Sequence, residues 1–160
     1  MPPKIIGLCG SLRKESYNRQ LLNQAVAEFG PCSYEEILLN LPLYDGDLED
    51  REGIPDGVQQ LVDAIKGADG VIVVGPEYNK GISGVLKNAL DWISRVPGGA
   101  WKNKPVAVMS AADGRTGGET AVLAATAGCP WTALEICNDF YVISGRSDGQ
   151  LALFDARAPR

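Results

Sequence analysis

Hydrophobic positions fall into two kinds of segment, and these alternate along the chain. One kind is a short run of consecutive apolar residues, which is typical of a strand buried on both faces of a parallel sheet. The run at 70–75 is the clearest, because it is β-branched, uncharged and bounded by glycines. The predicted strands cover residues 4–8, 33–39, 70–75, 105–109 and a bent or split fifth strand at 134–137 with 140–143.

The other kind of segment has apolar residues three and four positions apart, which is the spacing of an amphipathic helix. Glycine and proline follow two of these segments, at 30–31 and at 97–99, and are expected to end them. Ser83 stands where a helix N-cap is expected. Residues 42–55 show neither pattern and are predicted to form a long polar loop. The predicted helices cover residues 18–29, 57–66, 83–96 and 119–128.

Regular alternation of strand and helix predicts a parallel sheet with helices on both faces. At 160 residues, the chain fits a single domain over residues 1–160. Five strands suit the flavodoxin-like order 2-1-3-4-5, a three-layer α/β/α sandwich. In that order ligands bind beyond the carboxyl ends of the first and third strands. We therefore expect the functional site where these two strands end.

The first loop, residues 10–18, reads GSLRKESYN and follows the first predicted strand. A loop between a buried strand and a helix start presents backbone N–H groups and the positive end of the helix dipole to an anion. Ser11, Ser16 and Asn18 add short polar donors, while Arg13 and Lys14 add positive charge. Taken alone, the same residues are also compatible with an ordinary N-capped helix start.

The second loop, residues 75–83, reads GPEYNKGIS and follows the third predicted strand. Pro76 stiffens the exit from the strand, Tyr78 offers a flat apolar face, and Glu77 and Asn79 offer hydrogen-bonding groups. A ring against this loop and a phosphate in the first loop would belong to one mononucleotide. A dinucleotide is disfavoured, because the first loop lacks the G-x-G-x-x-G turn. On its own, the second loop also reads as a surface turn.

The amino-acid composition excludes several classes of reaction and binding site. The chain contains no histidine, which removes Ser-His-Asp hydrolysis and the usual general base near neutral pH. Its four cysteines show no C-x-x-C spacing, so we expect no metal site. Net charge is −5 with scattered basic residues, and no apolar run is long enough to span a membrane. We expect a soluble, cytoplasmic protein that binds neither nucleic acid nor membranes, with a bound cofactor doing any chemistry.

Three motifs, in order, resemble the NADPH-dependent FMN reductase family: GSLRKESYN at 10–18, PEYNKGISGVLKNALDWISR at 76–95, and GRTGG at 114–118. This family is flavodoxin-like and includes quinone, chromate and azo-compound reductases. The resemblance implies that FMN passes hydride from NADPH or NADH to a quinone, flavin or other small acceptor. The flavin N5 and no side chain is expected to carry the chemistry. For Glu77 we favour a positioning role over the alternative role of general acid. Arg13, Lys14 and Arg115 are candidates for the NADPH 2′-phosphate.

The resemblance also implies which residues bind FMN, in three groups. These are Ser11, Arg13, Ser16, Tyr17 (through its backbone) and Asn18 around the phosphate; Pro76, Glu77, Tyr78 and Asn79 beside the isoalloxazine ring; and Ser110, Gly114 and Gly117 along its other edge. The helix that includes 87–92 matches one that commonly mediates dimerisation, so a homodimer or homotetramer is expected. The family's last helix is expected to be missing here, because only five residues follow Asp155.

Two other classes of function stay open at this stage. A flavodoxin-type electron carrier would bind FMN but turn over no substrate of its own, and the acidic stretch at 45–52 is compatible with docking to a redox partner. A regulatory or scaffold module would have kept the fold and lost the cofactor. Oxidation of NADPH separates the enzyme from the carrier, and FMN uptake separates both from the module. Fold alone does not decide among them.

Overall fold

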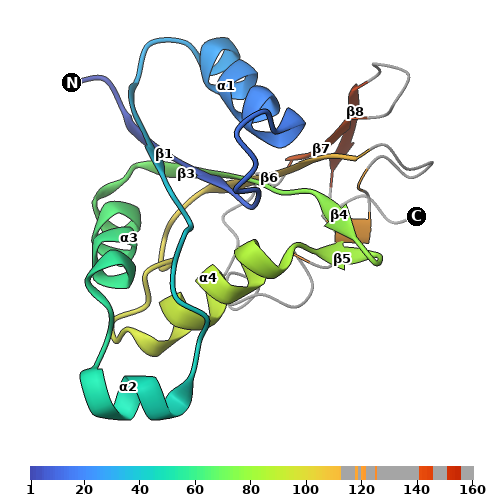
Figure 1. The fold of residues 1–160 in the computed structure, drawn as a ribbon. Coiled ribbons are helices and arrows are strands. Elements are labelled where there is room, and N and C mark those ends of the chain that lie inside the picture. The colour runs from blue at the N-terminus through green and yellow to red at the C-terminus, as the bar shows by residue number, and fades with distance from the viewer. Residues whose placement is uncertain (113–117, 119, 122–124, 126–140, 146–150, 156–160) are drawn as a thin grey trace.

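A computed structural model gives the structure of the protein and describes residues 1–112, 118, 120–121, 125, 141–145 and 151–155 (Figure 1). Strands and helices alternate along most of this length, as the sequence predicts. The elements are β1 (Lys4–Cys9), α1 (Tyr17–Phe29), β2 (Ser33–Ile37), α2 (Gly46–Glu52), α3 (Asp56–Gly67), β3 (Gly70–Val74), β4 (Glu77–Tyr78), β5 (Gly81–Ile82), α4 (Gly84–Arg95), β6 (Val106–Ala111), β7 (Tyr141–Gly145) and β8 (Leu151–Asp155).

The main sheet has the order β2-β1-β3-β6-β7-β8. Its first five strands pair in parallel, which confirms the predicted flavodoxin-like order. A sixth strand, β8, pairs antiparallel with β7 and was not predicted. The signal for it is Asp148-Gly149 between two apolar runs, which is a hairpin pattern. The predicted strand segment at 134–137 lies outside the described residues.

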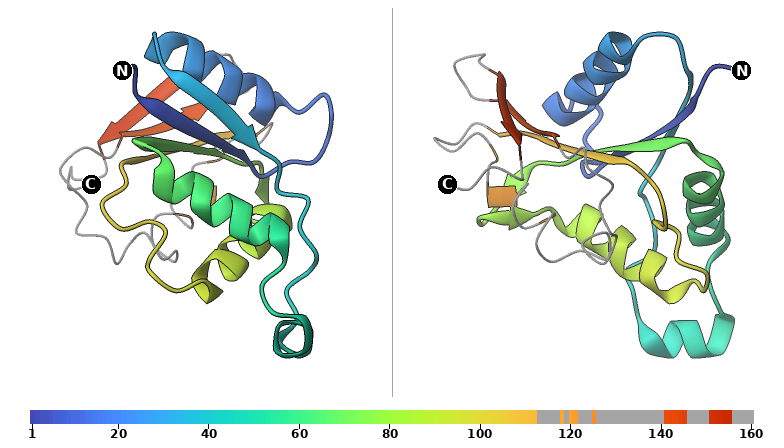
Figure 2. Two further views of the ribbon diagram at one scale, coloured as in Figure 1. Left: turned by 90° about the vertical axis from the view of Figure 1, so that its left-hand side faces the viewer. Right: turned by 180° about the vertical axis from the view of Figure 1, so that it is seen from behind.

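Helices cover both faces of the sheet, so the predicted three layers are confirmed (Figures 1 and 2). Helix α1 packs on one face, and α3 and α4 pack on the other. Neighbouring residues of a strand point to opposite faces. Accordingly, Ile6 and Leu8 of β1 join the core under α3 and α4, while Ile5 and Cys9 join the core under α1. Burial on both faces explains why these strands read as continuous apolar runs.

The predicted polar loop at 42–55 contains a helix, α2, which is a correction to the sequence analysis. None of its residues is buried, so the hydrophobic spacing that reveals other helices is absent. Its end signals are polar: the Asp45 carboxylate accepts a hydrogen bond from the Asp47 N–H at 2.9 Å. Gly53 ends the helix with a φ of 78°. The segment is held to α4 by Trp92, whose Nε1 donates to the Pro42 carbonyl at 2.8 Å.

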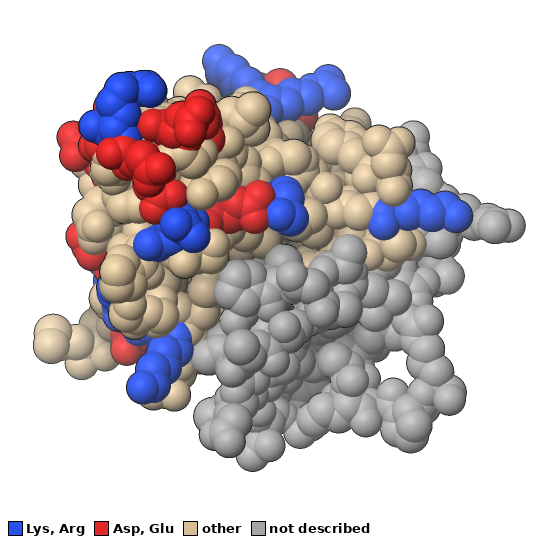
Figure 3. Space-filling view, turned by 90° about the horizontal axis from the view of Figure 1, so that it is seen from below, with Lys and Arg blue, Asp and Glu red and all other residues tan. Residues whose placement is uncertain are grey.

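The remaining sequence expectations concern the last predicted helix, membrane-spanning segments and the distribution of charge. The predicted helix at 119–128 lies mostly outside the described residues, of which 120, 121 and 125 are helical. No helix of the described part is long and apolar enough to cross a bilayer. Figure 3 shows acidic and basic side chains next to one another at one end of the visible face. Positive and negative charges are therefore interspersed there and do not form a separate basic or acidic patch.

Candidate functional site

Both loops predicted to form the site contribute to one cavity of about 330 Å³ at the carboxyl edge of the sheet. The volume is in the range of small-ligand sites. The lining residues are Ser11, Arg13, Glu15, Ser16, Tyr17, Asn18, Pro76, Glu77, Tyr78, Ala111 and Ala112. A larger cavity, about 450 Å³, lies toward the start of β1, β3 and β6 and contains none of the predicted site residues.

Hydrogen bonds at Gly10 hold the starts of the two loops together. The Gly10 N–H donates to the Val74 carbonyl at 2.7 Å. The buried Ser83 hydroxyl donates to the Gly10 carbonyl at 2.6 Å and accepts from the Leu86 N–H at 3.2 Å. A Cβ at Gly10 would lie 2.9 Å from Ser83 Oγ and 3.0 Å from Leu86 Cβ. Glycine is therefore required here by packing, which places the first loop directly against the start of α4.

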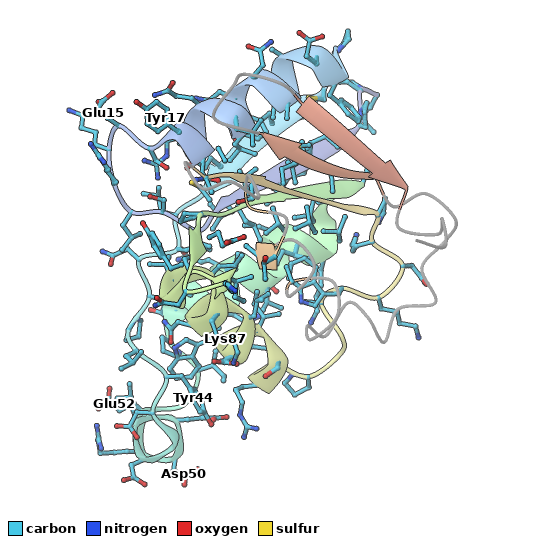
Figure 4. The ribbon with its side chains drawn as sticks, turned by 90° about the vertical axis from the view of Figure 1, so that its right-hand side faces the viewer. Glu15, Tyr17, Tyr44, Asp50, Glu52 and Lys87 are labelled. Carbon is cyan, nitrogen blue, oxygen red and sulfur yellow. The ribbon has the colours of Figure 1, made fainter. Side chains whose placement is uncertain are left out.

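The first loop leads into α1 with Ser16 as the N-cap, and the Ser16 side chain makes no capping hydrogen bond. Ser16 is buried and is one of the residues that line the cavity. Uncapped N–H groups, the helix dipole and the exposed Arg13 together suit an anion such as a phosphate. Figure 4 shows Glu15 and Tyr17 projecting from the N-terminal end of α1, and Tyr17 is 75% exposed.

Asn18 joins the first loop to the end of β6. Its Oδ1 accepts a hydrogen bond from the Ala111 N–H and its Nδ2 donates to the Ala111 carbonyl, both at 2.8 Å. Asn18 is only 4% exposed, while Ala111 is half-buried. This contact uses one of the two Nδ2 hydrogens. The predicted phosphate contact of Asn18 stays a prediction, and the positioning of β6 is an additional role that sequence spacing does not reveal.

Arg19 is a residue of the site region that the sequence analysis missed. Its guanidinium donates to the carbonyls of Ser11 at 3.2 Å and Arg13 at 3.0 Å, and to the Glu36 carboxylate at 2.8 Å. The hydrogen bond with Glu36 is the main reason that the pKa of Arg19 is raised. Glu36 lies on β2, so no local pattern in the sequence points to this partner.

The second loop forms a small antiparallel hairpin of β4 and β5. Asn79 and Lys80 at its turn have φ values of 52° and 60°, which is the backbone of a type I′ turn. Asn79 is at the tip and is not among the residues that line the cavity. The Glu77 carboxylate accepts hydrogen bonds from the N–H groups of Thr120 at 3.1 Å and Ala121 at 3.2 Å. These contacts attach the second loop to residues 120–121, and the expected positioning role of Glu77 toward the flavin stays a prediction.

The third predicted group is only partly described, because Gly114 and Gly117 lie outside the described residues. Ser110 lies on β6, is 1% exposed, and its hydroxyl has no hydrogen-bond partner within the part of the chain that the structure describes. It lines a separate space of about 10 Å³ beside Pro76. A Cβ at Gly118 would collide with the Ser110 hydroxyl, so Gly118 lies directly against this residue.

Cys9 lies beneath the first loop, with its Sγ 3.7 Å from the Ser11 carbonyl oxygen. Burial raises the pKa of the Cys9 thiol, which disfavours the thiolate that a nucleophile or metal ligand requires. Among the described residues, no group of three His, Cys, Asp or Glu side chains is arranged to hold a metal ion. The cavity lining carries the Arg13 guanidinium beside the carboxylates of Glu15 and Glu77. Arg13, the serine hydroxyls, the backbone N–H groups and the tyrosine faces are the groups that suit an organic phosphate with a planar ring.

Comparisons with known proteins agree with this geometry. The model of the NADPH-dependent FMN reductase family matches residues 3–146. A quinone reductase of Escherichia coli K12 is 40% identical over 119 residues, and the alignment covers 72% of this chain and 63% of the relative. An NAD(P)H-dependent FMN reductase of Pseudomonas aeruginosa is 39% identical over 116 residues, covering 71% of this chain and 62% of that protein.

The fold is also similar to that of a solved flavoenzyme structure. The flavoenzyme NAD(P)H:(acceptor) oxidoreductase FerB from Paracoccus denitrificans superposes with a TM-score of 0.66 at 36% identity, covering 76% of this chain and 67% of FerB. The alignments with the two curated relatives span less than two thirds of those proteins' lengths. With the family model matching most of its length, this chain belongs to the NADPH-dependent FMN reductase family.

Proposed function

We propose that this protein is an FMN-dependent NAD(P)H oxidoreductase that reduces a quinone, a flavin or another small acceptor. The observation that carries the proposal is the single cavity lined by both the first and the second loop. Membership of the family and the names of the relatives support the same activity. When bound, FMN supplies two-electron transfer between a nicotinamide and an acceptor.

In this proposal different residues of the cavity bind different parts of FMN and of its substrates. Arg13 and the uncapped N-terminus of α1 stabilise the phosphate by charge-assisted hydrogen bonds. Pro76 and Tyr78 form an apolar wall on the other side, against which a flat ring packs. The exposed rings of Tyr17 and Tyr78 offer stacking surfaces at the cavity mouth for the planar nicotinamide or quinone. The expected contacts of Ser110, Gly114 and Gly117 with the far edge of the ring stay predictions, because Ser110 lines a separate small space and the two glycines lie outside the described residues.

The electron-carrier alternative depends on an acidic surface for a redox partner. The acidic helix α2 is distant from the cavity: Figure 4 shows Asp50 and Glu52 at the opposite end of the molecule from Glu15 and Tyr17. A carrier transfers electrons through the exposed part of its cofactor, so an acidic surface far from the cavity gives this alternative no support. We therefore favour an enzyme with its own small-molecule substrates.

Oxidation of NADPH by the FMN-loaded protein, with and without a quinone, tests the function. We expect consumption of NADPH that requires both FMN and the quinone. Arg13→Ala is expected to weaken FMN binding by roughly 1.5–3 kcal/mol, because it removes a charge-assisted contact. Arg51→Ala, which removes a guanidinium of α2 paired with Glu52, is the matched control and leaves FMN binding unchanged. Bound FMN without NADPH consumption identifies a carrier, and failure to bind FMN identifies the cofactor-free module.

We also propose a homodimer or homotetramer in the cytoplasm. Leu38 and Leu43 are 67% and 80% exposed, and such side chains favour self-association. Cys9 and Cys32 are free thiols, as expected in a reducing compartment. Sedimentation of the purified protein tests the assembly, for which a monomer at all concentrations would be the contrary result.

A further inference from the structure

We propose that Arg19 is the positioning residue of the phosphate site: it binds two carbonyl groups of the first loop and so leaves the opposite N–H groups for the phosphate. The inference rests on the proposed function, because it concerns how the first loop recognises FMN. Arg19 is outside the cavity wall, so it acts through the loop and not on the cofactor.

Three hydrogen bonds fix the guanidinium of Arg19. Nη2 donates to the Ser11 carbonyl, Nη1 to the Arg13 carbonyl and Nε to Glu36 Oε1. The Arg19 and Glu36 side chains are 21% and 20% exposed, so water competes little for this pair. Glu36 is on β2, and its backbone is in register with Gly7 of β1. The loop is thereby tied to the main sheet through one planar group.

The geometry of the peptide bond connects these contacts to anion binding. In a trans peptide the C=O and the following N–H point in opposite directions, and the described chain has no cis peptide bond. The carbonyls of Ser11 and Arg13 point to Arg19, so the N–H groups of Leu12 and Lys14 point away from it. A carbonyl oxygen facing a phosphate would repel it, whereas an N–H attracts it. Arg19 thus selects the favourable orientation of two peptide groups.

Charge alone does not account for this arrangement. The Arg19 cation is paired with the Glu36 carboxylate at 2.8 Å, so the pair together adds no net charge near the loop. What arginine supplies is a planar set of donors at fixed angles, which reaches three acceptors at once. Lysine keeps the charge but has a compact ammonium group without this fork. Arg19→Lys therefore separates orientation from charge.

The test compares FMN with riboflavin, which has the same ring and no phosphate. Dissociation constants for both are measured on the wild type, Arg19→Lys and Arg19→Ala by fluorescence titration. We expect the FMN dissociation constant to rise roughly tenfold or more in both variants, with riboflavin changed less than about twofold. Arg95→Ala is the matched control, because it removes another arginine–glutamate pair, with Glu49 at 2.9 Å, away from the loop. We expect this control to change neither constant.

Equal weakening of FMN and riboflavin overturns the inference, since it means that the variant disturbs the whole site. An unchanged FMN dissociation constant in Arg19→Lys also overturns it. Should Arg19→Ala fail to fold, Arg19→Lys carries the comparison alone, with the same loss restricted to FMN expected. As a second readout, FMN is expected to slow amide hydrogen exchange at Leu12 and Lys14 in the wild type and not in Arg19→Lys. A wild type that binds neither flavin instead refutes the proposed function.

Discussion

Replacing Ser83 by alanine removes the hydroxyl that joins the first loop to α4. In the wild type this hydroxyl donates to the Gly10 carbonyl at 2.6 Å and accepts from the Leu86 N–H at 3.2 Å. Ser83 is 1% exposed, and both backbone partners are buried. Water therefore has little access to replace either hydrogen bond in the variant.

Ser83→Ala lowers the free energy of unfolding in two ways, through the lost N-cap and through the unpaired Gly10 carbonyl. Loss of a serine N-cap costs about 1 kcal/mol. A buried carbonyl left without a donor costs roughly 1–3 kcal/mol. We expect Ser83→Ala to lower the free energy of unfolding by about 2–4 kcal/mol, a large share of the stability of a domain of this size.

Urea unfolding, followed by circular dichroism, measures this change through the transition midpoint. Ser94→Ala is the matched control on the same helix, because the Ser94 hydroxyl also donates to a backbone carbonyl, that of Asp91 at 2.6 Å, but is exposed. It is expected to cost less than about 0.5 kcal/mol. A Ser83→Ala variant that loses no more stability than Ser94→Ala would refute the reasoning.

Three further predictions concern stability. Lys80→Gly is expected to stabilise the protein by about 1 kcal/mol, because Lys80 has a φ of 60° at a turn position where glycine is unstrained; lower stability in a urea transition would contradict this. The pKa of Glu49 is lowered, chiefly by its hydrogen bond from Arg95. Its stabilisation is complete above the ordinary value of 4.5 and is lost as pH falls through the lower folded value, so Glu49→Gln and wild type should converge in acid; a constant difference at all pH values would count against it. Tyr34→Phe is expected to keep or raise the free energy of unfolding, because the buried hydroxyl has no partner within the described chain and burial raises the pKa of Tyr34 to about 12; a loss above about 1 kcal/mol would argue otherwise.

The sheet order and the meeting of the two loops could be predicted because both follow from hydrophobic pattern. Runs such as 70–75 are apolar on both faces only when helices cover both faces, and the order of a doubly wound sheet brings the ends of its first and third strands together. The same reasoning misses α2, since a helix with no buried residue has no hydrophobic period. It also misses β8, which pairs antiparallel at the edge.

Within the site, the sequence pattern reveals the residues that line the cavity. It does not reveal the residues that hold the loops in position. Arg13 and Ser16 are recognisable because of their place in the first loop. Arg19 pairs with Glu36 on strand β2, and Ser83 pairs with Gly10 at the start of the first loop. Such pairs depend on packing in three dimensions. For the same reason, the need for glycine at position 10 is seen to come from contacts with α4.

The claim that one FMN molecule contacts both loops is tested most directly by nuclear magnetic resonance. Backbone amide spectra of the 17.0 kDa protein are recorded while FMN is added. We expect amide shifts in residues 11–18 and also in residues 77–78, with saturation at the same FMN concentration. Shifts confined to one loop, or saturation of the two loops at different concentrations, would contradict a shared site.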